Sequence, residues 1–500
     1  IVALGVDAVW ISPFYPSPMK DFGYDVANYR DIDPIFGTLD DFRNLLAECH
    51  SAGLKVIIDQ VWSHTSDQHP WFVQSRADGS NPRADWYVWA DAKPDGSPPN
   101  NWLSVFGGPA WTWDSGRHQY FLHNFLASQP DLNFHNPQVQ DAVLDIARFW
   151  FDLGVDGFRL DVCNFYFHSP RLEDNPVRED GWQGAKPHDW QAHVHCRSQP
   201  ENLPFLARLR QLAESYGGRL LLGEIGDDKG MERQIEYTAG DRLLHMAYSF
   251  DLLTPDGSPE RLRAILQTWL EAGEGTPVWA IGNHDVPRVA TRWTGGQPDP
   301  AQLRMFAAFH ACLPGPICIY QGEELGLEQV ELTFEKLRDP EGIAMWPRGK
   351  GRDGCRTPMV WESERRNAGF SEAEETWLPI GDALIEQAAD QQTGDDGSLL
   401  NLYRKLLAWR RDCRCVRMGS LALLETDRGV LAWSLSDGED RLHCVFNFSR
   451  GKKRLDNYVA DFSGSSSLFG EGAAQADEAL YLDGYGWSIL ATSASGGNSG

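Results

Sequence analysis

The sequence predicts a protein of the α/β class built on a (β/α)8 TIM barrel, and three observations lead to this prediction. Apolar, strand-like runs alternate with helix-like segments along most of the 500 residues, which favours a parallel sheet covered by helices. Seven of these runs end in polar residues, as barrel strands do at the end where reactions take place. Long irregular stretches and a β-patterned final segment account for the residues beyond the ~250 that a barrel needs.

The predicted strands share an apolar body and a polar end, and they cover residues 6–13, 55–60, 155–161, 220–224, 245–251, 278–285 and 317–324. Helices are predicted over 38–53, 139–154 and 301–313. In the first helix Thr38 and Asp41 have the spacing of a capping box, and Gly53 ends the last turn. Seven strands are one short of a barrel, and the chain opens in what resembles the end of a helix. We therefore expect that the first strand is missing and that the chain is an N-terminal truncation of a longer protein.

The chain is expected to divide into a barrel and two additional domains. Residues 1–64 and 136–415 would form the catalytic barrel without its first strand. Residues 65–135 are rich in Pro, Trp, Asp and Asn and would form a small domain inserted after the third barrel strand. Residues 416–491 alternate apolar and polar side chains over 429–436, 441–449 and 485–490, which predicts a C-terminal antiparallel β-sandwich. Residues 492–500 would be a flexible tail.

Composition excludes several classes of partner. The formal net charge of −26 argues against nucleic acid and anionic membranes, because both repel an acidic surface. No apolar run approaches the ~20 residues that a membrane span requires. The nine cysteines are scattered and include no CxxC pair, which is typical of reduced thiols in a cytoplasmic protein. The oligomeric state cannot be inferred from the sequence.

Four predicted strands end in acids, and this is the strongest functional signal in the chain. The acids are Asp59, Asp161, Glu224 and Asp285. Each follows an apolar run, where an unpaired carboxylate would be costly. A structural ion pair could explain one of them, but four at the same end of successive strands indicate a reaction site.

The surroundings of two of these acids predict different roles. Arg159 lies two residues before Asp161 on one strand, so both point to the same face, and a nearby cation lowers a carboxylate pKa. An ionised Asp161 would be a suitable nucleophile. Glu224 follows the apolar run LLLG with no cation beside it in sequence, and an apolar setting suits a general acid. One nucleophilic and one acid/base carboxylate are the groups of a retaining glycosidase, while Asp59 is expected to orient its neighbours.

Four motifs resemble those of the α-amylase family of glycoside hydrolases. They are DQVWSH (59–64), GFRLD (157–161), GEIG (223–226) and GNHD (282–285), in the family's order, and the resemblance covers nearly the whole chain. The resemblance implies Asp161 as nucleophile, Glu224 as acid/base and Asp285 as transition-state stabiliser. It also implies sugar contacts from the residues beside them, which are His64, Arg159 and His284.

A finer similarity points to the α-glucosidase and oligo-1,6-glucosidase branch of that family. It rests on DFGYD (21–25), HTSDQHPWF (64–72), QPDLN (129–133) and GRDGCRTPM (351–359). The branch implies that Tyr24 stacks on the terminal glucose and that Asp21 and Arg352 bind its far hydroxyls, closing the pocket for exo action. Arg356 is the alternative to Arg352. The branch associates a Val after the nucleophile, here Val162, with α-1,6 linkages and a Thr with α-1,4 linkages.

The sequence gives only weak support for a metal-binding site. No organic cofactor is required, and no metal ligand is assigned. Ser63 stands where many members of the family have an Asn that helps to bind calcium, which argues against that site. Calcium stays an open alternative through the N-terminal loop that the chain lacks. His64, Asp67 and His69 could suggest a metal cluster, but a sugar contact for His64 is favoured.

Other motifs have structural interpretations. The Trp-rich run WYVWADAKPDG (86–96) is expected in the core of the inserted domain, with an exposed sugar platform as the alternative. Glu323 and Glu324 are expected to pair with neighbouring groups rather than to react.

The function expected from these residues is that of an exo-acting, retaining α-glucosidase. It would release terminal glucose from short oligosaccharides or α-glucosides through a covalent glucosyl-enzyme, with transglucosylation as a side reaction. An α-glucosyl transferase or a sucrose isomerase with the same triad is the alternative. A non-catalytic scaffold is disfavoured because all three acids are present.

Overall fold

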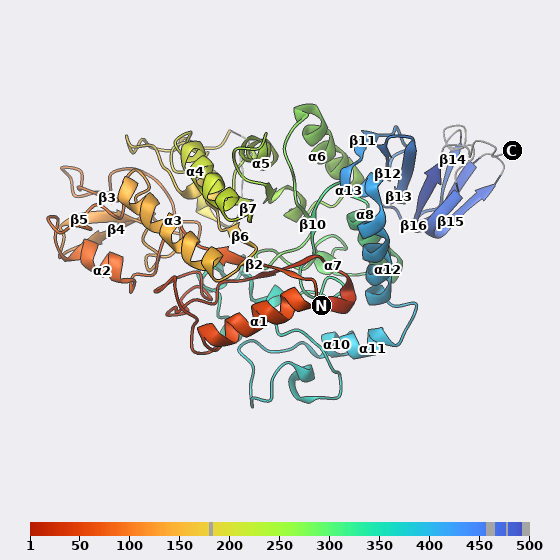
Figure 1. Ribbon diagram of the computed structural model, residues 1–500, viewed down its shortest axis with the longest axis horizontal. Coiled ribbons are helices and arrows are strands. Elements are labelled where there is room, and N and C mark those ends of the chain that lie inside the picture. Colours follow the sequence, from red (N-terminus) through yellow and green to blue (C-terminus); the bar gives the residue numbers. More distant parts are fainter. Residues whose placement is uncertain (180–183, 457–465, 477–478, 493–500) are drawn as a thin grey trace. The chain divides into compact units, whose positions relative to one another are not determined.

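The computed structural model describes residues 1–179, 184–456, 466–476 and 479–492, and these residues divide into two compact units (Figure 1). The N-terminal unit comprises Val6–Phe250 and Thr333–Gly351. The C-terminal unit comprises Ile1–Gly5, Asp251–Leu332 and Arg352–Gly500. The domain boundaries expected from the sequence stay a prediction.

A parallel sheet forms the centre of the N-terminal unit. Its five strands in the described residues have the order β1-β2-β6-β7-β8, and every neighbouring pair is parallel. Their bounds are β1 Ala8–Ile11, β2 Lys55–Gln60, β6 Gly157–Leu160, β7 Leu220–Ile225 and β8 Met246–Ser249. The register sets Asp59 opposite Arg159 and Glu224 opposite Tyr248. All five strands fall within the runs predicted from the sequence, apart from the one-residue extension of β7 at Ile225.

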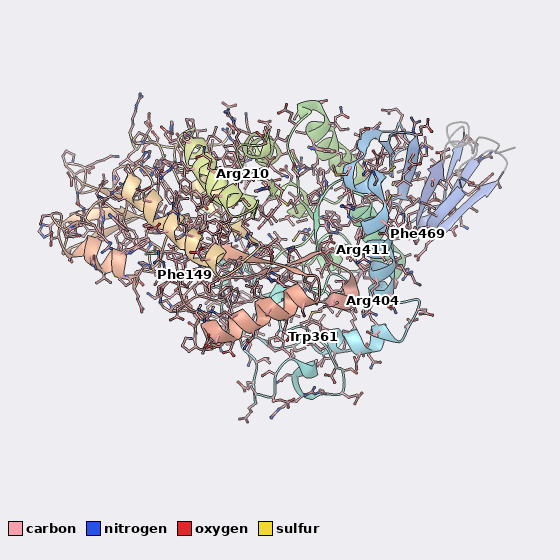
Figure 2. The ribbon with its side chains drawn as sticks, in the orientation of Figure 1. Phe149, Arg210, Trp361, Arg404, Arg411 and Phe469 are labelled. Atoms are coloured by element: carbon pink, nitrogen blue, oxygen red, sulfur yellow. The ribbon has the colours of Figure 1, made fainter. Side chains whose placement is uncertain are left out.

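The described residues of this unit also form α-helices. They are α1 Leu39–Ser51, α2 Pro70–Ala77, α3 Pro137–Asp152, α4 Asn202–Ser215, α5 Gly230–Thr238 and α9 Pro340–Met345. The predicted capping box of α1 is present, because the Thr38 side chain accepts from the Asp41 amide and Asp41 accepts from the Thr38 amide. Figure 1 shows α3 beside α4, and Arg210 of α4, labelled in Figure 2, donates to the carbonyl of Leu243 at 3.0 Å.

Glycine permits the close approach of β6 and β7. A Cβ added at Gly157 would lie 2.6 Å from the Leu220 Cβ and 2.7 Å from its carbonyl oxygen. Any larger residue would push apart the two strands that carry Arg159 and Glu224. The glycine at the start of GFRLD therefore has a packing reason.

The segment 65–135 contains α2 and a small antiparallel sheet of order β3-β5-β4. The strands are β3 Trp89–Ala90, β4 Trp111–Asp114 and β5 Gln119–Leu122. Trp86, Tyr87 and Val88 are buried, as expected for a core rather than for an exposed sugar platform. Phe72 of α2 stacks on Trp89 with 5.9 Å between ring centroids, so aromatic contacts join the helix to the sheet.

The C-terminal unit contains two short parallel strands, β9 Trp279–Ala280 and β10 Ile317–Cys318. These fall within the predicted runs 278–285 and 317–324, but only two residues of each pair as strands. The helices are α6 Pro259–Ala272, α7 Val289–Arg292, α8 Pro300–Ala311, α10 Asp382–Ile385, α11 Ala389–Thr393, α12 Leu399–Asp412 and α13 Arg414–Met418. Figure 1 shows α8 beside α12, and the two helices are in contact.

An antiparallel sheet follows these helices, as the sequence predicted. The order among the described residues is β11-β12-β13-β16-β14, and β15 also pairs with β16. The bounds are β11 Ser420–Leu423, β12 Val430–Asp437, β13 Asp440–Asn447, β14 Lys453–Asp456, β15 Ser466–Ala476 and β16 Ala479–Thr492. Phe469 of β15, labelled in Figure 2, meets Trp409 of α12 edge-on at 5.5 Å. The expected tail lies outside the described residues except for Thr492, which ends β16.

Short 3-10 helices occur in both units, at Val2–Leu4, Cys163–Phe165, Pro187–Trp190, Asp251–Leu253, Phe334–Lys336, Asp353–Cys355 and Arg366–Gly369. All nine cysteines are free thiols, and Cys49, Cys318 and Cys413 are the ones that are not fully buried. Among the residues described, none of the helices has both the length and the apolar character to cross a membrane.

Candidate active site

Arg159 of β6 is the centre of the polar cluster at the ends of the parallel strands. Its side chain has no exposed surface. The Nη1 atom donates to Asp59 Oδ1 at 2.8 Å and to Asp161 Oδ1 at 2.6 Å. The Nη2 atom lies 2.5 Å from Glu224 Oε2. One guanidinium thus contacts three of the four acids that end predicted strands.

The strand register explains this convergence. Asp59 is paired with Arg159 across β2 and β6, and β7 lies on the other side of β6. Asp161 follows β6 directly, so its side chain points to the face that Arg159 occupies. The sequence therefore places one cation on the middle strand and acids on both neighbours.

Three aromatic rings surround the guanidinium. Arg159 lies 4.7 Å from the centroid of the Trp10 ring and 5.9 Å from those of Tyr24 and Tyr248. Trp10 Nε1 donates to Asp59 Oδ2 at 3.2 Å, and the Tyr24 hydroxyl donates to the same oxygen at 3.0 Å. These contacts fix Asp59 in place, which agrees with its expected orienting role.

Burial governs the protonation of this cluster. Burial raises the pKa of Asp161 well above its ordinary value, Arg159 opposes the rise, and the carboxylates of Glu224 and Asp59 add to it. Burial also raises the pKa of Asp59 to about 6, again against Arg159. Arg159 lowers the pKa of Asp161 as expected, but burial outweighs this effect, so the net shift is upward. One guanidinium shared by three buried carboxylates cannot offset the loss of water around them.

Glu224 also differs from its expected setting. The sequence shows no cation beside it, but the fold brings Arg159 to 2.5 Å. The Tyr248 hydroxyl donates to Glu224 Oε1 at 2.8 Å, and the Val162 amide donates to Oε2 at 3.0 Å. Both oxygens are therefore held, and the residue lies in a polar contact network rather than an apolar pocket.

Val162 has a strained backbone. Its φ is 33° and its ψ is 50°, a left-handed conformation that is unfavourable for a β-branched residue. This conformation turns its amide toward Glu224 Oε2. The residue directly after the expected nucleophile thus also positions the expected acid/base.

The expected sugar-binding residues Asp21, Tyr24 and His64 lie together in the N-terminal unit. Gln129 connects them, because its Nε2 atom lies 3.0 Å from Asp21 Oδ2, 3.4 Å from the Tyr24 carbonyl and 3.1 Å from His64 Nε2. His64 Nδ1 contacts the Ser63 hydroxyl at 2.9 Å. Burial lowers the pKa of His64 to about 4, so the ring is neutral near pH 7.

The C-terminal unit holds the other expected residues in a second group. Asp285 Oδ1 accepts from Arg352 Nη1 at 3.3 Å and from Arg356 Nη2 at 3.0 Å. His284 Nε2 lies 3.4 Å from Asp285 Oδ2, and Arg356 Nε donates to the His284 carbonyl at 2.7 Å. Both arginines contact Asp285, so the alternatives left by the sequence stay open.

The structural interpretations of the remaining acids agree with their contacts. Glu323 Oε1 accepts from the Tyr403 hydroxyl at 3.0 Å and lies 3.1 Å from His310 Nδ1. Asp67 pairs with Lys20 at 2.9 Å, and His69 caps α2 by accepting from the Trp71 amide. Within the described ranges, no group of three or more His, Cys, Asp or Glu side chains is placed to hold a metal ion.

Four contributions to the site were missed from the sequence. The contacts of Trp10, Tyr248 and the Val162 amide with the acids depend on which strands are neighbours, so the sequence alone did not indicate them. Gln129 had a signal, because it opens the QPDLN motif, but no role was assigned to it.

Comparisons with known proteins agree with these motifs. The model of the alpha-amylase catalytic domain matches residues 1–419. A probable alpha-glucosidase from Rhizobium meliloti (strain 1021) is 51% identical over 459 residues, which are 90% of this chain and 83% of that protein. An oligo-1,6-glucosidase from Parageobacillus thermoglucosidasius is 34% identical over 479 residues, covering 89% of this chain and 84% of the relative.

A solved structure is similar over nearly the whole chain. The crystal structure of an alpha-glucosyl transfer enzyme is 48% identical, with a TM-score of 0.94, and the match covers 98% of this chain and 92% of that one. These matches confirm the predicted fold class, an α/β barrel with a C-terminal antiparallel β domain.

Proposed function

The chain belongs to the α-amylase family and is a glycoside hydrolase of the α-glucosidase type, and from this premise we propose that it removes terminal glucose with retention of configuration. The substrates would be short oligosaccharides or α-glucosides. Asp161 is the proposed nucleophile, Glu224 the proposed acid/base and Asp285 the proposed stabiliser of positive charge.

One observation carries this proposal. Asp161 and Glu224 contact the two terminal nitrogens of one guanidinium, at 2.6 and 2.5 Å. A shared guanidinium limits the separation of the two carboxyl groups. The two acids of retaining glycosidases lie closer together than those of inverting ones, which need room for a water molecule, so the shared guanidinium supports retention.

The reaction follows from these positions. Glu224 gives a proton to the glycosidic oxygen while Asp161 attacks the anomeric carbon, so a glucosyl-enzyme forms and the aglycone leaves. Glu224 then takes a proton from water as the water oxygen attacks the same carbon, and Asp161 leaves as a carboxylate.

The proposed sugar-binding residues are divided between two groups of contacts. In the N-terminal unit they are Asp21, Tyr24, His64 and Arg159, with Gln129 as a support. His284 and Arg352 are the residues of the C-terminal unit. The linkage preference rests on Val162, which favours α-1,6 bonds by resemblance.

The test is glucose release from isomaltose and from maltose, with Asp161→Asn as the control. We expect release from both, faster from isomaltose, and a loss of at least about a thousandfold in the variant, because a neutral amide cannot form the glycosyl ester. Equal activity of the variant would reject Asp161 as the nucleophile. Release from maltose alone would reject the linkage proposal.

An α-glucosyl transferase is the second candidate, and the similar solved structure favours it, since that protein is an alpha-glucosyl transfer enzyme. The same glucosyl-enzyme would serve both reactions, and the acceptor that reaches it decides the product. Product analysis at high acceptor concentration separates the two. Mostly free glucose supports hydrolysis, and mostly new glucosides support transfer.

A further inference from the structure

We propose that Tyr248 is a positioning residue that stabilises the ionised form of Glu224 and thereby favours the second half of the reaction, in which the glucosyl-enzyme is broken down. This inference rests on the proposed function, because it assigns a role within the same reaction. Tyr248 belongs to none of the motifs that identify the family in this sequence.

The fold places Tyr248 directly beside the proposed acid/base. Strands β7 and β8 are parallel neighbours, and their register pairs Glu224 with Tyr248. The Tyr248 side chain is buried, with 1% of its surface exposed. Its hydroxyl lies 2.8 Å from Arg159 Nη2 and 2.8 Å from Glu224 Oε1.

The direction of these two hydrogen bonds follows from the groups involved. A guanidinium only donates, so the Tyr248 oxygen accepts from Arg159. The Tyr248 hydroxyl in turn donates its one proton to Glu224 Oε1. Oε1 is thus the acceptor in this hydrogen bond.

The second oxygen of Glu224 is an acceptor as well. Glu224 Oε2 accepts from the Val162 amide at 3.0 Å and lies 2.5 Å from Arg159 Nη2. Donors on both oxygens stabilise a carboxylate and disfavour its protonated form. The arrangement around Glu224 is thus the one that a general base needs.

The two halves of the reaction place opposite demands on Glu224. In the first half it must hold a proton and give it to the leaving oxygen. In the second half it must be ionised, so that it takes a proton from water while the C1–O bond to Asp161 breaks and the C1–O bond to water forms. Donation from Tyr248 favours the starting state of the second half at the expense of the first.

Tyr248→Phe isolates the hydroxyl. The ring packs 6.1 Å from Trp10 and 5.9 Å from Arg159, and Phe keeps both contacts. Tyr237→Phe is a matched control, because Tyr237 is also buried and its hydroxyl accepts from Asn202 at 3.1 Å. Thermal melting of both variants checks that they are folded.

The measurement is stopped-flow release of nitrophenol from p-nitrophenyl α-glucoside. In Tyr248→Phe we expect kcat to fall roughly 10- to 100-fold while kcat/KM changes less than about threefold, because only the second half slows. A burst of nitrophenol and a glucosyl-enzyme detected by mass spectrometry should appear.

The rate of turnover in the presence of azide distinguishes a role in the second half of the reaction from a purely structural role. Azide attacks the glucosyl-enzyme without a general base, so it should restore turnover of Tyr248→Phe and yield glucosyl azide. The Tyr237→Phe variant should show neither burst nor rescue.

Two outcomes would overturn the inference while the proposed function stands. One is an equal fall of kcat and kcat/KM without a burst, which would place Tyr248 in the first half. The other is unchanged kinetics. If the wild-type protein itself releases no nitrophenol, the proposed function fails first and this inference fails with it.

Discussion

At the scale of single residues, Arg159 determines the chemistry of the cluster. Its guanidinium contacts Asp59, Asp161 and Glu224, all of them buried. One positive charge does not offset the burial of the carboxylates around it, so the pKa of Asp161 and that of Asp59 are both raised. The retaining mechanism proposed for this chain needs one acid protonated while the other is ionised.

Val162 provides a test of linkage preference at this scale. Val162→Thr exchanges a methyl for a hydroxyl and keeps the β-branch. It also leaves in place the hydrogen bond from the backbone amide of residue 162 to Glu224. We expect the ratio of kcat/KM for isomaltose over maltose to fall several-fold, since one hydroxyl is worth about 1 kcal/mol of discrimination. Val162→Ile, which stays apolar, is the control. If the isomaltose-to-maltose ratio of kcat/KM is unchanged in Val162→Thr, this side chain does not determine the linkage preference.

The acids could be predicted from the sequence, but their environments could not. Asp161 and Glu224 end apolar runs, and that pattern is visible in the letters alone. The contact of Glu224 with Arg159 and Tyr248 depends on which strands are neighbours and on their register. The backbone conformation of Val162 likewise has no sequence signal, because β-branched residues usually avoid positive φ.

At the scale of elements, the predictions were best where local signals agree. The strand 55–60 and the capped helix α1 match their predicted positions, because apolar periodicity and the Thr38 and Asp41 cap act within a few residues. The strands at 278–285 and 317–324 shorten to two paired residues each. The polar ends of the two runs are not part of the paired strands. His284 and Asp285 therefore lie in irregular backbone that follows β9.

Helix α2 shows the opposite case. It lies in the segment 65–135, for which no helix was predicted. The helix begins at Pro70 after the His69 cap, and its aromatic contact with Trp89 belongs to tertiary structure. Packing against a distant strand, rather than local periodicity, stabilises this element.

At the scale of the whole molecule, buried neutral histidines predict sensitivity to acid. Burial lowers the pKa to about 4 for His64, about 3 for His69 and His168, and about 2 for His193. In the unfolded chain these rings titrate near 6.5, so the unfolded state binds more protons below that pH. Their stabilisation is complete above pH 6.5 and is lost as the pH falls toward the folded values.

Urea unfolding at pH 7 and at pH 5 measures this effect. For His64 alone the free energy of unfolding should fall by about 2 kcal/mol between the two pH values. The variant His64→Gln should lose less stability over the same range than the wild type, whereas His118→Gln, at an exposed turn, should behave like the wild type. An equal loss in all three proteins would contradict the assignment to buried histidines.

The most direct test of the central claim is to identify the residue that carries the glucosyl group. Glu224→Gln would be mixed with p-nitrophenyl α-glucoside, quenched in acid, digested and examined by mass spectrometry. We predict a glucosyl ester on Asp161, which accumulates because an amide cannot act as the base for its hydrolysis. A glucosyl group on Asp59 or Asp285 would contradict the assignment of Asp161. Release of glucose with inverted anomeric configuration, with no adduct on the wild-type enzyme, would contradict the retaining mechanism.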